Sequence, residues 1–92
     1  MLKIEYSARM KHDVKLMEKR GKDLRKMTYL LTLLASGSPL PGTYRDHALS
    51  GKWKGTRECH IEPDWLLLYV LHNDVLVVTA TATGSHADLF GL

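Results

Sequence analysis

Residues 65–71, WLLLYVL, constrain the fold more than any other stretch of this chain, because they are apolar at nearly every position. A β-strand of this composition needs cover on both of its faces. Turn-forming tripeptides flank the stretch at residues 62–64 and 72–74. Segments with a period of two, about residues 53–61 and 75–83, lie beyond these turns. Short turns between successive strands predict a three-stranded antiparallel meander.

The N-terminal part of the chain predicts the layer that covers one face of this sheet. Residues 2–6 alternate between apolar and polar side chains, which predicts a short half-buried strand. A helix capped by Ser7 and ended by Gly21 follows, and a second helix covers about residues 23–35. The joint between them is short, so we expect an antiparallel helix hairpin. Each helix has an apolar stripe: Met10, Val14 and Met17 in the first, and Leu24, Met27, Leu31 and Leu34 in the second.

The expected fold class is therefore α+β. An N-terminal strand and the helix hairpin come first, the three-stranded antiparallel meander follows, and the helices pack on the sheet. Residues 36–42, SGSPLPG, form the loop between the two parts, because their prolines and glycines cannot continue a helix. At 92 residues the chain is expected to form one domain, residues 1–92. The C-terminal tail is expected to hold one helical turn begun by Ser85.

Composition limits the partners and the compartment. The net charge of +3 and the pI of about 9.1 suit a nucleic acid or an acidic protein partner. A single cysteine excludes an internal disulfide and is compatible with a reducing cytoplasm. No apolar stretch approaches the ~20 residues of a membrane span, and the N-terminus lacks the apolar region of a signal peptide. We therefore expect a cytoplasmic protein with no membrane partner.

The side chains suited to chemistry gather in two segments, residues 47–65 and 83–91. These segments hold three of the five histidines, both tryptophans and the only phenylalanine. Imidazoles, a carboxylate and cations are the groups that metal-free cleavage of an RNA phosphodiester needs. The 2′-hydroxyl must lose a proton, the leaving 5′-oxygen must gain one, and the charged phosphorane between them must be stabilised. Composition alone makes this a weak indication, because such residues are common in small basic domains.

The order of short motifs is more specific than the composition. They read YRDH at residues 44–47, GKWKG at 51–55, RECH at 57–60, PDW at 63–65, TGSH at 83–86 and LFG at 89–91. In this order they resemble the YafQ group of the RelE-type toxins of bacterial toxin–antitoxin pairs, over nearly the whole chain. The resemblance implies a RelE-like fold, in agreement with the pattern above. It also implies a ribosome-dependent endoribonuclease that cuts mRNA in the A site of the 70S ribosome and is regulated by a cognate antitoxin.

The resemblance also implies which residues form the site. His47, His60, Asp64 and His86 match positions of the RNA-cleaving site of the family. An imidazole serves as base or acid near neutral pH, because its ordinary pKa is about 6.5, and Asp64 can orient one of them. The sequence leaves open which histidine takes the proton of the 2′-hydroxyl. The residues expected to contact RNA are Lys52, Lys54 and Arg57, which would hold the backbone, and Phe90, which either stacks on a base or caps the core.

Alternation along residues 52–61 divides the first meander strand into two faces. One face holds Lys52, Lys54, Thr56, Glu58 and His60, and the other holds Trp53, Gly55, Arg57, Cys59 and Ile61. The first face is either a track for phosphates or an ordinary solvated surface. On the second face, a buried Cys59 thiol is expected rather than a nucleophile. Trp65 is expected in the core or in the wall of the site.

A metal centre is the competing chemical interpretation. His47, His60, Asp64 and His86 are acceptable zinc ligands in type. Their scatter along the chain, with no HxxxH or CxxC pair, argues against a structural zinc. We therefore expect neither a metal nor another cofactor, and a metal-dependent nuclease would instead lose its activity to a chelator.

One position departs from the family pattern. The resemblance implies an arginine two residues before Gly84, where a guanidinium holds the scissile phosphate bidentately. This chain has Ala82 there, and loss of one transition-state donor commonly costs ~10²–10³-fold in rate. The close match elsewhere favours an introduced arginine-to-alanine change that disarms a toxic protein, which a genomic alanine codon would disprove. The alternative is natural divergence, with Arg57 or Lys54 taking over.

Ala82 also supports a hypothesis of another class. The chain would then be a non-catalytic RNA- or protein-binding module on the same fold. Restoring arginine at this position discriminates the two hypotheses, because only the enzyme would respond with growth arrest and mRNA cleavage.

Overall fold

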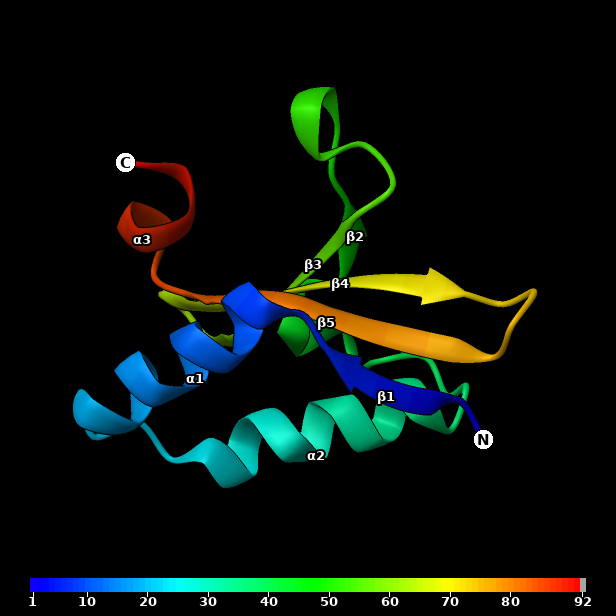
Figure 1. Cartoon of the computed structure of the whole chain (residues 1–92), viewed down its shortest axis with the longest axis horizontal. Helices are drawn as coiled ribbons and strands as arrows, with labels where there is room; N and C mark the ends of the chain where they lie inside the picture. Colours follow the sequence, from blue (N-terminus) through cyan, green and yellow to red (C-terminus); the bar gives the residue numbers. More distant parts are fainter. Residues whose placement is uncertain (92) are drawn as a thin grey trace.

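The computed structural model of this protein describes residues 1–91, in which five strands form one sheet with three α-helices around it (Figure 1). The elements in chain order are β1 (Lys3–Tyr6), α1 (Ala8–Lys19), α2 (Leu24–Ala35), the 3₁₀ turn η1 (Gly42–Tyr44), β2 (His47–Ala48), the 3₁₀ turn η2 (Gly51–Trp53), β3 (Arg57–Glu62), β4 (Trp65–His72), β5 (Val77–Gly84) and α3 (His86–Phe90). None of the helices in this part of the chain is long and apolar enough to cross a membrane.

The sheet has the strand order β1-β5-β4-β3-β2. Strands β3, β4 and β5 form the predicted antiparallel meander. Strand β1 lies beside β5 and parallel to it, so the first strand of the chain pairs with the last. The short strand β2 extends the other edge of the sheet by pairing antiparallel with β3. Helices α1 and α2 lie on one face of the sheet, and α3 lies on the other (Figure 1). The predicted α+β class is confirmed.

The larger core lies between the helix pair and the sheet. Met10 and Met17 of α1 and Leu31 of α2 are at most 1% exposed, and they pack in one cluster with Leu67 and Tyr69 of β4. Full burial of such a side chain stabilises a fold by roughly 1.5–3 kcal/mol. The apolar stripes that the sequence predicts for the two helices therefore form this core.

The helix ends follow the predicted signals. Ser7 accepts a hydrogen bond from the backbone N–H of Met10 at 3.0 Å, which caps α1. Gly21 follows the end of α1 with φ of +80°, a conformation that glycine adopts without the clash of a Cβ. Asp23, for which no capping role was predicted, caps α2 through a hydrogen bond from the backbone N–H of Arg25.

A second, smaller apolar cluster covers the opposite face of the sheet. Leu66 and Leu68 of β4, Ala82 of β5 and Leu89 of α3 are buried in it. Because β4 contributes side chains to both clusters, it needs apolar residues on both faces, as its composition predicts. The partly buried side chains that complete this second cluster are Leu49, Trp53 and Phe90.

A β-bulge in β5 decides which side of the sheet Ala82 faces. Leu68 of β4 pairs with Ala82, whereas the next residue, Tyr69, pairs with Ala80. Thr81 is therefore the extra residue, and the alternation of side chains shifts there by one position. Ala80 lies in the core under the helices and Ala82 in the second cluster, although they are two residues apart.

The prediction that the first meander strand begins at Trp53 is wrong. Residues Gly51–Trp53 form the turn η2, and β3 begins only at Arg57. Gly51 and Gly55 have φ of +65° and +92°, which a strand does not accommodate. Lys52 consequently does not share a strand face with His60. Lys54 also lies outside the strand, and the side chain of Trp53 packs in the second cluster rather than beside Cys59.

Two further features differ from the sequence predictions. Strand β1 is more exposed than the expected half-buried strand, since Ile4 and Tyr6 are 37% and 36% exposed at the edge of the sheet. Strand β2 was not predicted, because a pair of residues is too short to show a period. Tertiary pairing with β3, rather than local propensity, makes His47 and Ala48 a strand.

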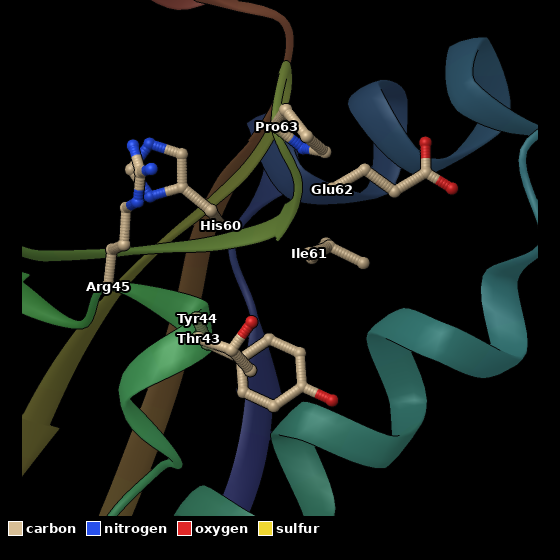
Figure 2. A pocket seen from close by; sticks show the side chains of 7 residues that line it. All are labelled: Thr43, Tyr44, Arg45, His60, Ile61, Glu62 and Pro63. Atoms are coloured by element: carbon tan, nitrogen blue, oxygen red, sulfur yellow. The ribbon is translucent and has the colours of Figure 1, made fainter.

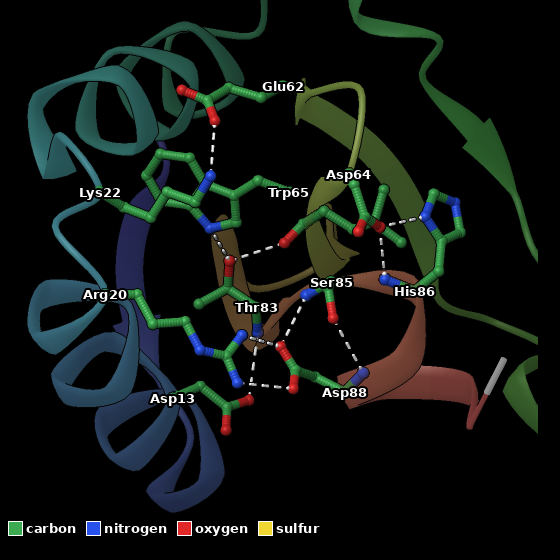
Figure 3. A network of polar contacts seen from close by, with 11 residues as sticks. Asp13, Arg20, Lys22, Glu62, Asp64, Trp65, Thr83, Ser85, His86 and Asp88 are labelled. Atoms are coloured by element: carbon green, nitrogen blue, oxygen red, sulfur yellow. Dashed lines mark hydrogen bonds and ion pairs between the residues drawn. The ribbon is translucent and has the colours of Figure 1, made fainter.

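A polar network crosses the core under α1 (Figure 3). The indole Nε1 of Trp65 donates to Oγ1 of Thr83 at 2.9 Å, and this hydroxyl donates to the carbonyl of Leu66 at 2.6 Å. The backbone N–H of Thr83 donates to Oδ2 of Asp13 at 3.2 Å. The network thus ties the end of β5, next to α3, to β4 and α1.

Removing the Thr83 hydroxyl should destabilise the protein. Thr83→Val keeps the shape of the side chain but leaves the buried indole N–H of Trp65 without an acceptor. We expect the free energy of unfolding to fall by about 1–3 kcal/mol, measured by urea denaturation. Thr79→Val is the control, because no hydrogen bond of the Thr79 hydroxyl occurs within residues 1–91. An equal change in both variants would contradict this role of Thr83.

Candidate functional site

Three histidines from three different elements meet on the face of the sheet opposite α1 and α2. His47 lies on β2, His60 on β3 and His86 at the start of α3. The ring centroids of His47 and His60 are 6.3 Å apart, and those of His60 and His86 are 5.7 Å apart. Two carboxylates lie beside these rings. We call the group formed by His47, Glu58, His60, Asp64 and His86 the histidine site.

Asp64 fixes the orientation of His86 (Figure 3). Its Oδ1 accepts a hydrogen bond from the backbone N–H of His86 at 2.8 Å and another from the ring Nδ1 at 2.6 Å. These two bonds, the backbone one first, hold the pKa of the Asp64 carboxyl below its usual value. Asp64 therefore stays ionised, and the Nε2 of His86 is left free for a substrate.

The helix that carries His86 is held by its own cap and by α1. Ser85 caps α3 and forms a capping box with Asp88. Arg20, at the end of α1, donates to Oδ1 of Asp88 at 2.9 Å and also to Oδ2. These bonds from Arg20, followed by the backbone N–H of Ser85, hold the pKa of Asp88 well below its usual range. The ion pair connects the two faces of the sheet around its end (Figure 3).

The approach of Asp88 to β5 requires glycine at position 84. A Cβ at Gly84 would lie 2.9 Å from Cβ of Asp88 and 3.0 Å from its Oδ2. Any larger residue would push α3, and His86 with it, away from the end of the strand. The glycine of the TGSH motif is therefore explained by the close packing of Asp88 against it, which the sequence alone does not show.

His47 is fixed by the loop that precedes it. Its ring Nδ1 lies 2.7 Å from the carbonyl oxygen of Arg45, and because a carbonyl only accepts, Nδ1 carries the proton. The Nε2 of His47 then faces the site, 3.4 Å from Oε1 of Glu58.

His60 occupies the centre of the histidine site and is the most buried of its imidazoles. Its Nε2 lies 3.8 Å from Oε1 of Glu58, and its buried Nδ1 has no hydrogen-bond partner within residues 1–91. Burial lowers the pKa of His60 below its ordinary value of 6.5, and neighbouring His86, Arg45 and His47 lower it further, whereas Glu58 opposes them. A neutral imidazole at pH 7 is a competent proton acceptor.

Glu58 is a site residue that was not predicted from the sequence. Its side chain is only 7% exposed and lies between the Nε2 atoms of His47 and His60. A buried carboxylate is costly unless cations or donors surround it. Alternation along the strand places Glu58 on the face of His60, but it does not show that the carboxylate is buried beside two imidazoles.

The residues predicted to contact RNA do not form one surface: two are exposed, one packs against Trp53 and one is in an ion pair. Lys52 and Lys54 are exposed at the turn η2, and Nζ of Lys52 lies 6.0 Å from the ring centroid of Trp53. Phe90 packs edge-on against Trp53, with ring centroids 5.9 Å apart. Arg57 lies in an ion pair with Asp46, with both nitrogen–oxygen contacts at 3.3 Å, on the other side of β3 from His60.

The two residues expected to be structural are buried. Trp65 is fully buried in the core under the helices. Cys59 is fully buried as well, and burial raises the pKa of its thiol to about 12. A thiol of such high pKa is not available as a thiolate nucleophile near neutral pH.

A hollow of about 250 Å³ opens beside His60 (Figure 2). Residues 43–45 form one wall, and residues 60–63 form the other. Arg45 and His60 are both among the residues that line the hollow. A concave surface that includes the cationic side chain of Arg45 therefore adjoins the histidine site. Within residues 1–91, no group of three His, Cys, Asp or Glu side chains is arranged to hold a metal ion.

Comparison with known proteins identifies the family. The family model described as the bacterial toxin of type II toxin–antitoxin system, YafQ, matches residues 2–91. The mRNA interferase toxin YafQ of Escherichia coli strain K12 is 52% identical over 89 residues, which cover 96% of this chain and 95% of that protein.

Solved structures agree with this match. The crystal structure of the E. coli DinJ-YafQ complex contains a chain that superposes with a TM-score of 0.89 at 48% identity, covering 99% of this chain and 100% of that chain. A metal-bound toxin from Helicobacter pylori superposes with a TM-score of 0.92 at 39% identity, covering 98% of this chain and 100% of that chain. In sequence and in fold, the chain belongs to the YafQ family of bacterial type II toxin–antitoxin toxins.

Proposed function

We propose that this protein is an mRNA endoribonuclease that acts on the ribosome and cleaves through the 2′-hydroxyl of the RNA. The observation that carries the proposal is the convergence of three imidazoles and two carboxylates on one face of the sheet, beside an open hollow. The E. coli relative, named an mRNA interferase toxin, supports it. E. coli YafQ forms a toxin–antitoxin complex with DinJ. A cognate antitoxin is therefore the proposed regulator of this chain. The proposed site of action is the A site of the 70S ribosome, the proposed substrate is the mRNA bound there, and the proposed compartment is the cytoplasm.

The chemistry would need no metal. His60, whose pKa is lowered, takes the proton of the 2′-hydroxyl, and the 2′-oxygen attacks the phosphorus. The bond from phosphorus to the 5′-oxygen breaks, and His86 gives that oxygen a proton. Asp64 orients His86 through the hydrogen bond to its ring Nδ1. The products are a 2′,3′-cyclic phosphate, which water can open to a 3′-phosphate, and a 5′-hydroxyl.

The remaining residues would position RNA. His47 and Glu58 flank His60 and complete the polar surface around the phosphate. The exposed Lys52 and Lys54 are placed to meet the RNA backbone, and Phe90 to meet a base at the edge of the second cluster. A contact of Arg57 with RNA would require its ion pair with Asp46 to open. With Ala82 in place of an arginine, we expect this chain to be a weakened enzyme.

A reconstituted cleavage reaction tests this proposal. Purified protein is mixed with a defined mRNA, with and without programmed ribosomes, and the ends of the products are identified. We expect cleavage with ribosomes that yields 5′-hydroxyl and cyclic or 3′-phosphate ends and is unaffected by EDTA. To spare the Mg²⁺ that ribosomes need, the protein alone is treated with the chelator and then passed through a desalting column. Products with 5′-phosphate ends, or loss of activity after the chelator, would contradict the metal-free mechanism.

A further inference from the structure

The proposed reaction needs a cation at the phosphate, and position 82 does not provide one. The side chain of Ala82 is fully buried among Leu66, Leu68 and Leu89, so it presents no group to the surface. Of the nearby cations, Arg57 is paired with Asp46 on the other side of β3. The charged phosphorane of the transition state would gain most from a cation that lies beside the imidazoles themselves.

Arg45 is the cation that lies there. Arg45 and His60 line the same hollow (Figure 2). Arg45 is exposed, and the structure pairs its side chain with no carboxylate of residues 1–91. Its positive charge is close enough to contribute to the lowered pKa of His60. An arginine without a counter-ion in the lining of a hollow favours an anionic ligand there.

The backbone of Arg45 gives a second indication. Arg45 has φ of 50° and ψ of 42°, the left-handed conformation that glycine or asparagine adopts at lower energy. In this conformation its carbonyl oxygen accepts the hydrogen bond from Nδ1 of His47. Any residue, including glycine, would supply that carbonyl. The backbone contact therefore does not explain why the position holds an arginine.

The adjacent residue holds the loop in place. Asp46 accepts hydrogen bonds from Nε and Nη2 of Arg57 and from the hydroxyl of Tyr69. Tyr69 is fully buried in the core, so this anchor belongs to the rigid part of the fold. The loop that carries Arg45 and His47 is thus fixed to β3 and β4, which holds the backbone of Arg45 at the hollow.

We propose that Arg45 is a catalytic residue that binds the scissile phosphate through its guanidinium and contributes to the stabilisation of the phosphorane, without replacing all that an arginine at position 82 would add. The planar guanidinium can donate two parallel hydrogen bonds to two phosphate oxygens. The inference rests on the proposed function. It differs from the takeover by Arg57 or Lys54 that the sequence suggests, because Arg45 lines the hollow beside His60 and these two residues are not among its lining residues.

The test compares variants at saturating protein in single-turnover cleavage of ribosome-bound mRNA. Arg45→Gln keeps the start of the side chain and the backbone preference but removes the charge, and Arg45→Lys keeps a point charge. Arg25→Ala is the matched control, since it removes one arginine charge from the exposed side of α2. Thermal unfolding of each variant shows that it is folded.

We expect Arg45→Gln to lower the saturating rate by ~10²–10³-fold, Arg45→Lys to lower it less, and Arg25→Ala to leave it unchanged. The acidic limb of the pH profile of Arg45→Gln should also move to higher pH, because a nearby cation no longer lowers the pKa of His60. A saturating rate equal to that of the parent would overturn the role of Arg45, even if half-saturation needs more protein. If the parent and Ala82→Arg both fail to cleave, the proposed function falls, and this inference falls with it.

Discussion

Replacing His60 by asparagine is expected to lower the single-turnover rate of mRNA cleavage by about 10²–10⁴-fold, the usual contribution of a general base. Asparagine keeps a polar side chain of similar reach but accepts no proton near neutral pH. The matched control is His72→Asn, because His72 is exposed at the far end of β4. The measurement is the rate at saturating protein on programmed ribosomes, with folding checked by thermal unfolding.

The pH profile of the parent should assign the base. Burial lowers the pKa of His60 below 6.5, so the base form persists below that pH and is lost as the pH falls through the lowered pKa. The charged and titratable groups that face the ring are Glu58 on the same strand, His47 on β2, His86 on α3 and Arg45 in the loop before β2. The acidic limb of the parent should therefore lie below pH 6.5 and should be absent in His60→Asn.

Two outcomes would contradict this assignment. A His60→Asn protein that cleaves as fast as His72→Asn would show that His60 is not the base. A variant that is slow but keeps the acidic limb unchanged would assign the limb to another group of the histidine site, with His47 as the first to examine because its Nε2 also faces the site.

Ala82→Arg is expected to raise the cleavage rate by ~10²–10³-fold, if the new guanidinium reaches the phosphate. The position is fully buried beside Leu66 and Leu68, so the aliphatic part of the new side chain must pass between these residues before its charged end reaches water. Crowding of this kind typically costs about 1–3 kcal/mol, and we expect the variant to be less stable than the parent.

Ala82→Met is the control for this variant, because it has a similar length without the charge. We expect the rate to rise in Ala82→Arg alone. Combining Ala82→Arg with Arg45→Gln tests whether both positions serve the same phosphate, since the loss caused by Arg45→Gln should then be smaller than in the parent. A folded Ala82→Arg protein that is no faster than Ala82→Met would show that an arginine at this position does not contribute to cleavage here.

Most of the fold could be predicted from the sequence, because its signals are local. The apolar stripes around Met10 and Leu31 and the continuous apolar run of β4 each determine which face must be covered. The parallel pairing of β1 with β5 brings together strands from the two ends of the chain. The alternation of side chains within one segment cannot predict such a long-range pairing. The late start of β3 was missed because the glycines at 51 and 55 interrupt an apparent alternation.

Only part of the candidate site could be predicted from the sequence. The resemblance names His60 and His86, but only the sheet brings their rings within 5.7 Å. Glu58 was overlooked because the sequence does not show that its carboxylate is buried against two imidazoles. Arg45 belongs to a loop whose left-handed backbone no pattern predicts. The bulge at Thr81, likewise, decides that Ala82 faces the second cluster rather than the helices.

Mapping mRNA ends in bacteria that express the protein tests the central claim most directly. The parent, Ala82→Arg and Ala82→Arg combined with His60→Asn are induced in parallel, growth is followed, and 5′-hydroxyl ends are sequenced. We predict new ends at a fixed position within codons of translated mRNA, strong with Ala82→Arg, weaker with the parent and absent with the combined variant. If none of the three proteins produces new ends while all are folded, the enzyme account is wrong, and a binding module on the same fold becomes the better explanation.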